Sequence, residues 1–176
     1  MENLLCYLKT YQTLVAGIVG FTAVVFTMLA NAYLQRAQHK RAIQHEKQAL
    51  RSALKAELNA NIQIYEHRIE QFNEPGGDKD ALMQNKVQDN VYNRLLEKIG
   101  ILEPGEIKAI IEAYQLIYET PYRIRILVGT DAIGGFENEH IRLKSEHIGT
   151  VKKIHKALMP KILAAIESID QHSKNA

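Results

Sequence analysis

The sequence predicts an all-α membrane protein, in which a single N-terminal transmembrane helix continues into a long helix and a cytoplasmic bundle of about four helices. Three observations indicate this fold class. The run from Leu14 to Leu34 contains no charged residue, and neither Gly nor Pro occurs between Gly20 and Phe72. Beyond the run, apolar residues recur every three or four positions, which is the period of an amphipathic helix.

The uncharged run reads LVAGIVGFTAVVFTMLANAYL, and we interpret residues 13–35 as a membrane span. A helix of about 20 residues, at ~1.5 Å per residue, covers the hydrocarbon core of a bilayer. A cleaved signal peptide is the alternative, because Lys9 precedes the run. The retained span is favoured because Asn31, Tyr33 and Gln35 stand where a signal peptide carries small residues for cleavage.

The charges beside the span predict its orientation. The N-terminal flank, residues 1–12, holds Glu2 and Lys9 together with leucines and tyrosines that either extend the helix or lie in the membrane interface. Four basic residues follow the span: Arg36, Lys40, Arg41 and Lys47. Basic flanks stay in the cytoplasm. We therefore expect a bacterial inner-membrane protein with its N-terminus outside, whose residues Arg36, Lys40 and Arg41 contact anionic lipid headgroups.

Small and hydroxyl-bearing residues form a stripe along one side of the span. They recur at alternating steps of three and four: Thr13, Ala16, Gly20, Ala23, Thr27 and Ala30. Gly17 and Asn31 lie on or beside this stripe. Helices in a bilayer associate through close backbone approach along small residues. The stripe therefore predicts a homo-oligomer, and the alternative is that Gly and Ala are frequent in any span.

Residues 36–48 contain few apolar side chains and predict a polar helical stalk between the bilayer and the domain. The helical bundle is expected over residues 49–172, followed by a frayed tail at 173–176. Its first helix ends near Phe72, before a break at residues 73–80 that contains a Pro-Gly-Gly sequence.

A second helix is expected from Ala81 to Ile99, with Gly100 as its stop. The residues of its apolar face are Val87, Val91, Leu95 and Ile99. A third helix begins at Glu103 and Pro104, since proline is tolerated in a first turn.

Pro121 is expected to break or kink the third helix. Residues 122–128 either continue it or form a short strand, because RIRILV alternates; the helix is favoured since no partner strand is evident. A loop is expected over residues 129–136. The last helix is expected to start near Glu137 and to kink at Pro160.

Most enzyme classes find no support in the sequence. It contains no phosphate-binding loop and no CxxC, HExxH or GxSxG motif. Cys6 is the one cysteine, which excludes an internal disulfide. No acidic residue accompanies the histidines convincingly at metal-ligand spacing, so we expect no metal, other cofactor or small-molecule substrate. A net charge of only +2 predicts no broad nucleic-acid surface.

Histidines and an arginine gather on the predicted last helix: His140, Arg142, His147 and His155. Arg142 and His147, with four residues between them, resemble the arginine–histidine motif of HEPN domains, which are helical bundles and often ribonucleases. In that family the arginine and histidine of two subunits converge on a phosphodiester. The resemblance implies that Arg142 and His147 are the catalytic residues of any such activity.

The size, the single span and this pair together resemble the small HEPN-like membrane accessory proteins of type VI-B CRISPR systems, which form membrane pores and strengthen phage defence. This resemblance implies an oligomeric ring, and RNA or an RNA-guided effector as a further partner. The favoured function is thus a non-enzymatic, self-associating pore-forming or membrane-perturbing effector, with Thr27 and Asn31 as polar candidates for an ion path. The alternatives are a membrane-tethered HEPN ribonuclease and a non-catalytic scaffold for a cytoplasmic partner.

Overall fold

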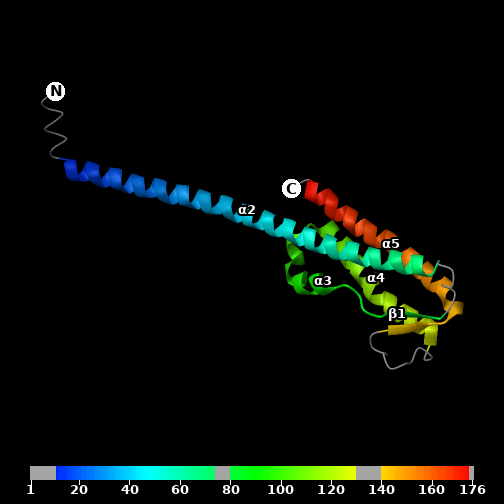
Figure 1. The fold of residues 1–176 in the computed structure, drawn as a ribbon. Coiled ribbons are helices and arrows are strands. Elements are labelled where there is room, and N and C mark those ends of the chain that lie inside the picture. The colour runs from blue at the N-terminus through cyan, green and yellow to red at the C-terminus, as the bar shows by residue number, and fades with distance from the viewer. Residues whose placement is uncertain (1–10, 74–79, 130–139, 175–176) are drawn as a thin grey trace. The chain divides into compact units, whose positions relative to one another are not determined.

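The computed structural model describes residues 11–73, 80–129 and 140–174, and it confirms the all-α fold class (Figure 1). The chain divides into two compact units, residues 1–45 and residues 46–176. The long N-terminal helix predicted from the sequence is confirmed as α2, Gln12–Gln71, which supplies residues to both units. The division between the units falls inside the predicted polar stalk.

The first unit contains the N-terminal part of α2. Every side chain described between Tyr11 and Leu34 is exposed. This helix is long and apolar enough to cross a membrane. Most of the predicted N-terminal flank, including Cys6, lies outside the described residues.

The second unit contains the rest of α2 and the elements that follow it. In chain order these are β1 (Ala81–Gln84), α3 (Asn90–Leu95), the 3-10 helix η1 (Leu96–Ile101), α4 (Pro104–Val128), β2 (His140–Leu143) and α5 (Ser145–Lys174). The two strands pair antiparallel, with Ala81 opposite Leu143 and Gln84 opposite His140.

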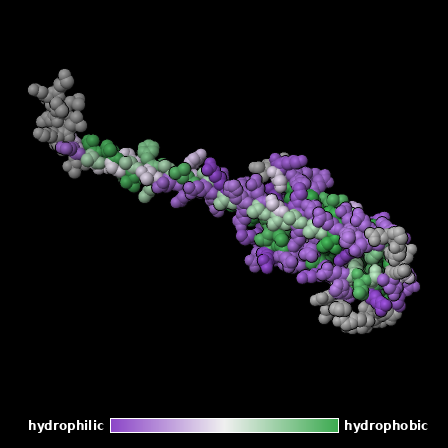
Figure 2. Space-filling view, in the orientation of Figure 1, coloured by the Kyte–Doolittle hydropathy of each residue, from purple (hydrophilic) through white to green (hydrophobic). Residues whose placement is uncertain are grey.

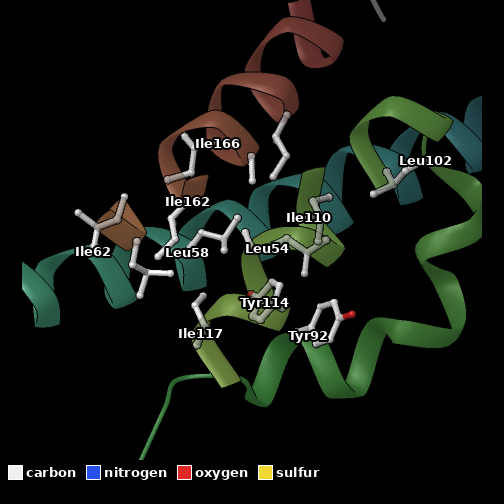
Figure 3. Close-up of a cluster of buried hydrophobic side chains, with 14 of the residues drawn as sticks. Leu54, Leu58, Ile62, Tyr92, Leu102, Ile110, Tyr114, Ile117, Ile162 and Ile166 are labelled. Carbon is white, nitrogen blue, oxygen red and sulfur yellow. The ribbon is translucent and has the colours of Figure 1, made fainter. Parts of the chain in front are cut away.

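One hydrophobic core joins α2, α4 and α5 (Figure 3). Its central members are Leu54 and Leu58 of α2, Ile110, Tyr114 and Ile117 of α4, and Ile162, Ile166 and Ile169 of α5. These residues recur every three or four positions, so each helix turns one apolar face inward. Full burial of one such side chain contributes about 1.5–3 kcal/mol, which makes this core the main source of stability in the second unit.

A smaller core forms around the two-stranded sheet. It unites Phe72, Met83, Ile124, Val128, Ile141, Leu143, Ile148 and Val151. Ile141 and Leu143 of β2 are buried, whereas Arg142 between them is exposed. This alternation is the period of a strand and explains why residues 140–143 do not join the following helix.

The prediction of a helix from Ala81 to Ile99 is wrong, because the stretch divides into β1, an irregular segment, α3 and part of η1. The helix was predicted because Val87, Val91, Leu95 and Ile99 are spaced four residues apart. The backbone of this stretch instead bonds to side chains of α2: Arg68 donates to the Gln84 carbonyl at 3.0 Å, and Asn61 donates to the Gln88 carbonyl at 2.7 Å. Gly100 is not a stop either, since η1 continues to Ile101.

The last helix begins at Ser145, so the predicted start near Glu137 is wrong; Glu137 itself lies outside the described residues. His140 and Arg142 were expected on this helix and belong to β2 instead. The predicted loops at 73–80 and 129–136 lie mostly outside the described residues.

Neither internal proline ends its helix. Pro121 lies inside α4 and Pro160 inside α5. An internal proline removes one backbone hydrogen bond and costs roughly 3 kcal/mol. Buried residues on both sides of each proline, such as Ile117 and Ile124 in α4, offset that cost. The alternative of a strand at residues 122–128 is therefore wrong.

Candidate functional site

Apolar side chains cover the surface of α2 between Leu14 and Leu34 (Figure 2). Phe21, Phe26 and Tyr33 are 71%, 72% and 75% exposed, respectively. A continuous apolar surface of this kind marks a site of membrane or protein interaction. The backbone polar groups of a helix bond within the helix, so this segment fits a hydrocarbon environment without unpaired amides.

The small-residue stripe leaves open space along this surface. A Cβ atom added to Gly17 or Gly20 would meet no atom within 4 Å. The folded chain itself therefore gives no reason for glycine at either position. Thr27 donates its hydroxyl to the Ala23 carbonyl at 2.8 Å, so that polar group is satisfied within its own helix. The side chain of Thr13 lies outside the described residues.

Asn31 differs from Thr27, whose hydroxyl bonds within the helix. Within the described ranges, its carboxamide has no hydrogen-bond partner, and the side chain is exposed. An unbonded amide in an apolar environment costs on the order of several kcal/mol. A hydrogen bond to a neighbouring helix would remove that cost. Arg36, Lys40 and Arg41 follow in the same helix and are exposed.

The structure places Arg142 and His147 on different elements. Arg142 lies in β2, where its guanidinium is 3.7 Å from the Asp80 carboxylate. His147 lies in the first turn of α5, with Nε2 3.5 Å from the Glu146 carboxylate. In the part of the chain that the structure describes, no hydrogen bond or ion pair joins Arg142 to His147.

The sequence analysis missed a polar cluster buried in the second unit. The Glu57 carboxylate accepts hydrogen bonds from the backbone N–H groups of Val91 and Tyr92, at 2.7 and 2.9 Å, and from the Tyr114 hydroxyl at 2.6 Å. Burial and the bond to Glu57 raise the pKa of Tyr114 far above its usual value. Glu57 thus holds the first turn of α3 in place, where a carboxylate is favoured by the helix dipole.

A buried ion pair is a second missed feature. Arg51 Nε and Nη2 donate to the two carboxylate oxygens of Glu106 at 2.8 and 2.9 Å. Both side chains are almost fully buried. Glu106 also forms a capping box with Glu103 at the start of α4. The pair therefore fixes how α2 meets the first turn of α4.

His155 is a third missed feature, because the sequence analysis grouped it with His140 and His147, which are only partly buried. Its ring is fully buried and stacks on Tyr65, with ring centroids 5.0 Å apart. Neither ring nitrogen has a hydrogen-bond partner among the described residues. Burial, with a smaller contribution from the Arg68 charge, lowers the pKa of His155 to about 4. Its position between Val151 and Leu158 on the apolar face was the available signal.

Comparison with protein-family models, curated proteins and solved structures found no match to this chain. Within residues 11–73, 80–129 and 140–174, no group of three or more His, Cys, Asp or Glu side chains is placed to hold a metal ion. The function must therefore be argued from the surfaces of the chain itself.

Proposed function

We propose that this protein is a single-pass membrane protein that self-associates through residues 13–35 and forms a pore or otherwise perturbs the bilayer. The observation that carries the proposal is the fully exposed apolar surface of α2 with its stripe of small residues. Spans gain no hydrophobic energy by pairing in lipid, so close packing along small residues is what drives their association.

The polar side chains of the span support a water-filled path between associated spans. Asn31 brings an unbonded carboxamide to the inner end of the segment, where another copy of the same residue is a suitable partner. Thr27 lies one turn away on the same face. A ring of such side chains is how polar lining arises in a channel built from single spans.

The basic residues after the span support a cytoplasmic location for the second unit, in a bacterial inner membrane. In this orientation Arg36, Lys40 and Arg41 contact anionic headgroups. The resemblance to HEPN-like accessory proteins of type VI-B CRISPR systems supports a role in phage defence, with RNA or an RNA-guided effector as a partner.

The test compares Gly20→Leu with Val25→Leu in the full chain. Leucine at position 20 fits the isolated chain, because a Cβ there meets no atom within 4 Å. A loss caused by Gly20→Leu therefore reports contact between chains. We expect Gly20→Leu to reduce the cross-linked oligomer in membranes and to abolish membrane depolarisation on expression. Val25→Leu, off the stripe, is expected to retain both, since lipid accepts either side chain.

Two results would contradict the proposal. If both variants assemble and depolarise like the parent protein, the small-residue stripe is not an interface. If the parent protein is monomeric in detergent and in membranes, the pore is excluded and a scaffold function replaces it.

A further inference from the structure

A surface groove in the second unit is lined by aromatic side chains of α3 and α4. The lining residues are Tyr92, Ile111, Gln115, Tyr118, Glu119 and Tyr122, and the groove, which is largely open to solvent, has a volume of ≈ 480 Å³. This volume is within the range of small-molecule sites. The features assigned so far, namely the span, the Glu57 cluster and the Arg51–Glu106 pair, give no reason for Tyr118 and Tyr122 to lie exposed beside the buried ring of Tyr92.

Two of the tyrosine rings form fixed, adjoining walls of the groove. Tyr92 stacks on Tyr114, with centroids 3.9 Å apart, and Tyr114 is fully buried in the core (Figure 3). The Tyr118 ring is tilted by 56° to that of Tyr92 at a centroid distance of 6.4 Å. The Tyr118 hydroxyl donates to Asn93 at 3.0 Å, which holds its ring in place. These walls need no rearrangement to receive a ligand.

The third ring is at the open side of the groove. Tyr122 lies one turn of α4 beyond Tyr118 and is 66% exposed. Ile111 lies two turns before Tyr118 on the same exposed face. The surface offered to a ligand therefore consists mainly of ring faces and edges, with an aliphatic patch at one end.

The charge beside the groove is negative. Burial, followed by the Asp89 charge, raises the pKa of Tyr118 to about 12, so its phenol is neutral. Asp89 accepts a hydrogen bond from Asn93 Nδ2 at 3.0 Å, and within the described ranges no cationic side chain pairs with it. Glu119 adds a second carboxylate, which Arg123 neutralises at 2.7 Å.

We propose that this groove binds a compact organic cation of the alkylammonium class, with a quaternary ammonium group against the exposed rings of Tyr118 and Tyr122, beside the largely buried ring of Tyr92. Aromatic faces attract cations through their quadrupole. The Asp89 carboxylate adds a favourable charge and disfavours anions. A quaternary ammonium has no hydrogen-bond donor to satisfy, so ring faces and one nearby carboxylate are sufficient to bind it. Such a group occurs on soluble metabolites and on lipid headgroups.

The test measures binding of choline to the full-length protein in nonionic micelles, by saturation-transfer NMR of the choline methyl signal. The neutral isostere 3,3-dimethyl-1-butanol has the same shape without the charge, and we expect it to bind at least roughly fivefold more weakly. Tyr122→Ala and Asp89→Asn are each expected to weaken choline binding roughly two- to fivefold. Tyr122→Phe keeps a ring face and is expected to retain binding.

Ile126→Ala is the matched control, because Ile126 is 65% exposed on the same helix and does not line the groove. It is expected to leave choline binding unchanged. Equal binding of choline and the neutral isostere would overturn the proposal, and so would the absence of saturable binding. Binding that survives both Tyr122→Ala and Asp89→Asn would place the cation elsewhere and overturn it as well.

The two sources of the cation are separated by repeating the titration in lipid nanodiscs. Weaker apparent binding of choline in phosphatidylcholine discs than in phosphatidylglycerol discs would identify a lipid headgroup as the occupant. Equal binding in both would identify a soluble cation. The proposal is independent of span association, since Gly20→Leu is expected to leave choline binding unchanged.

Discussion

Acidification is expected to destabilise the second unit through His155. A proton added to the buried ring finds no acceptor among the described residues, and the Arg68 cation disfavours the added charge further. The stacked neighbour, Tyr65, has its own pKa raised to about 12, chiefly by burial, so it offers no negative charge. The folded protein therefore keeps His155 neutral to an unusually low pH.

The sign and size of the effect follow from the two pKa values. An unfolded histidine titrates near 6.5, whereas the pKa of folded His155 is lowered to about 4. Between these values the unfolded state binds more protons, so the free energy of unfolding falls as the pH falls. The slope is about 1.4 kcal/mol per pH unit, which sums to roughly 3 kcal/mol between pH 6.5 and pH 4. This change is a large part of the free energy of unfolding of a typical domain, which is about 5–15 kcal/mol.

The assay is chemical denaturation of the full-length protein in nonionic detergent, followed by far-UV circular dichroism at several pH values between about 7 and 4.5. The parent protein is expected to lose stability along this series. His155→Leu removes the titrating group and puts an apolar side chain of similar size in its place. The free energy of unfolding of this variant should therefore fall less steeply with decreasing pH, by about 1.4 kcal/mol per pH unit. His67→Leu, at an exposed position of α2, is the matched control and should follow the parent protein.

The reasoning would be refuted if the stability of the parent protein stayed constant between pH 6.5 and pH 4.5. It would also be refuted if His155→Leu and His67→Leu lost stability with the same slope. In that case the pH dependence arises from other groups, such as the carboxylates.

Three further predictions concern other named side chains. Arg51→Met leaves the buried Glu106 carboxylate without its cation and should lower the free energy of unfolding by roughly 3–5 kcal/mol, whereas the double variant with Glu106→Leu should recover most of it in urea denaturation. Glu57→Gln keeps the shape of the side chain but loses an acceptor oxygen and the charge, so a loss of about 1–3 kcal/mol is expected, together with faster amide exchange at Val91 and its neighbour Tyr92. Purified protein should leave RNA intact, and Arg142→Ala with His147→Ala should not change this on a gel; degradation by the parent protein that is lost in the double variant would establish the ribonuclease.

The long helix and the helical class were predictable because they depend on local patterns. Leu50, Leu54, Leu58 and Ile62 repeat at helical spacing over a stretch without Gly or Pro, and the structure buries all four. No distant contact is needed to form such a helix, so the sequence alone carries the signal.

The two strands and the polar cluster were not predictable for the opposite reason. β1 and β2 are short, and each is a strand only because the other, far along the chain, supplies its hydrogen bonds. In the sequence, Glu57 and Asn61 are indistinguishable from ordinary polar residues of a helix. Their partners at positions 88–92 are backbone groups, and no sequence pattern predicts those hydrogen bonds. The burial of His155 could have been predicted, because this residue occupies a position in the apolar repeat of α5.

The bonds that α2 offers to residues 84–92 have a consequence for the order in which the chain folds. Glu57, Asn61 and Arg68 are synthesised before the backbone groups that they bind. Each of these partners therefore emerges next to a helix that can already have formed, and the bonded residues are 16, 27 and 34 positions apart. β1 can pair only after β2 has been synthesised, because its partner residues lie about 60 positions further along the chain. We expect the first turn of α3 to become protected early during synthesis, and the edge of β1 to stay open until the start of α5 has left the ribosome.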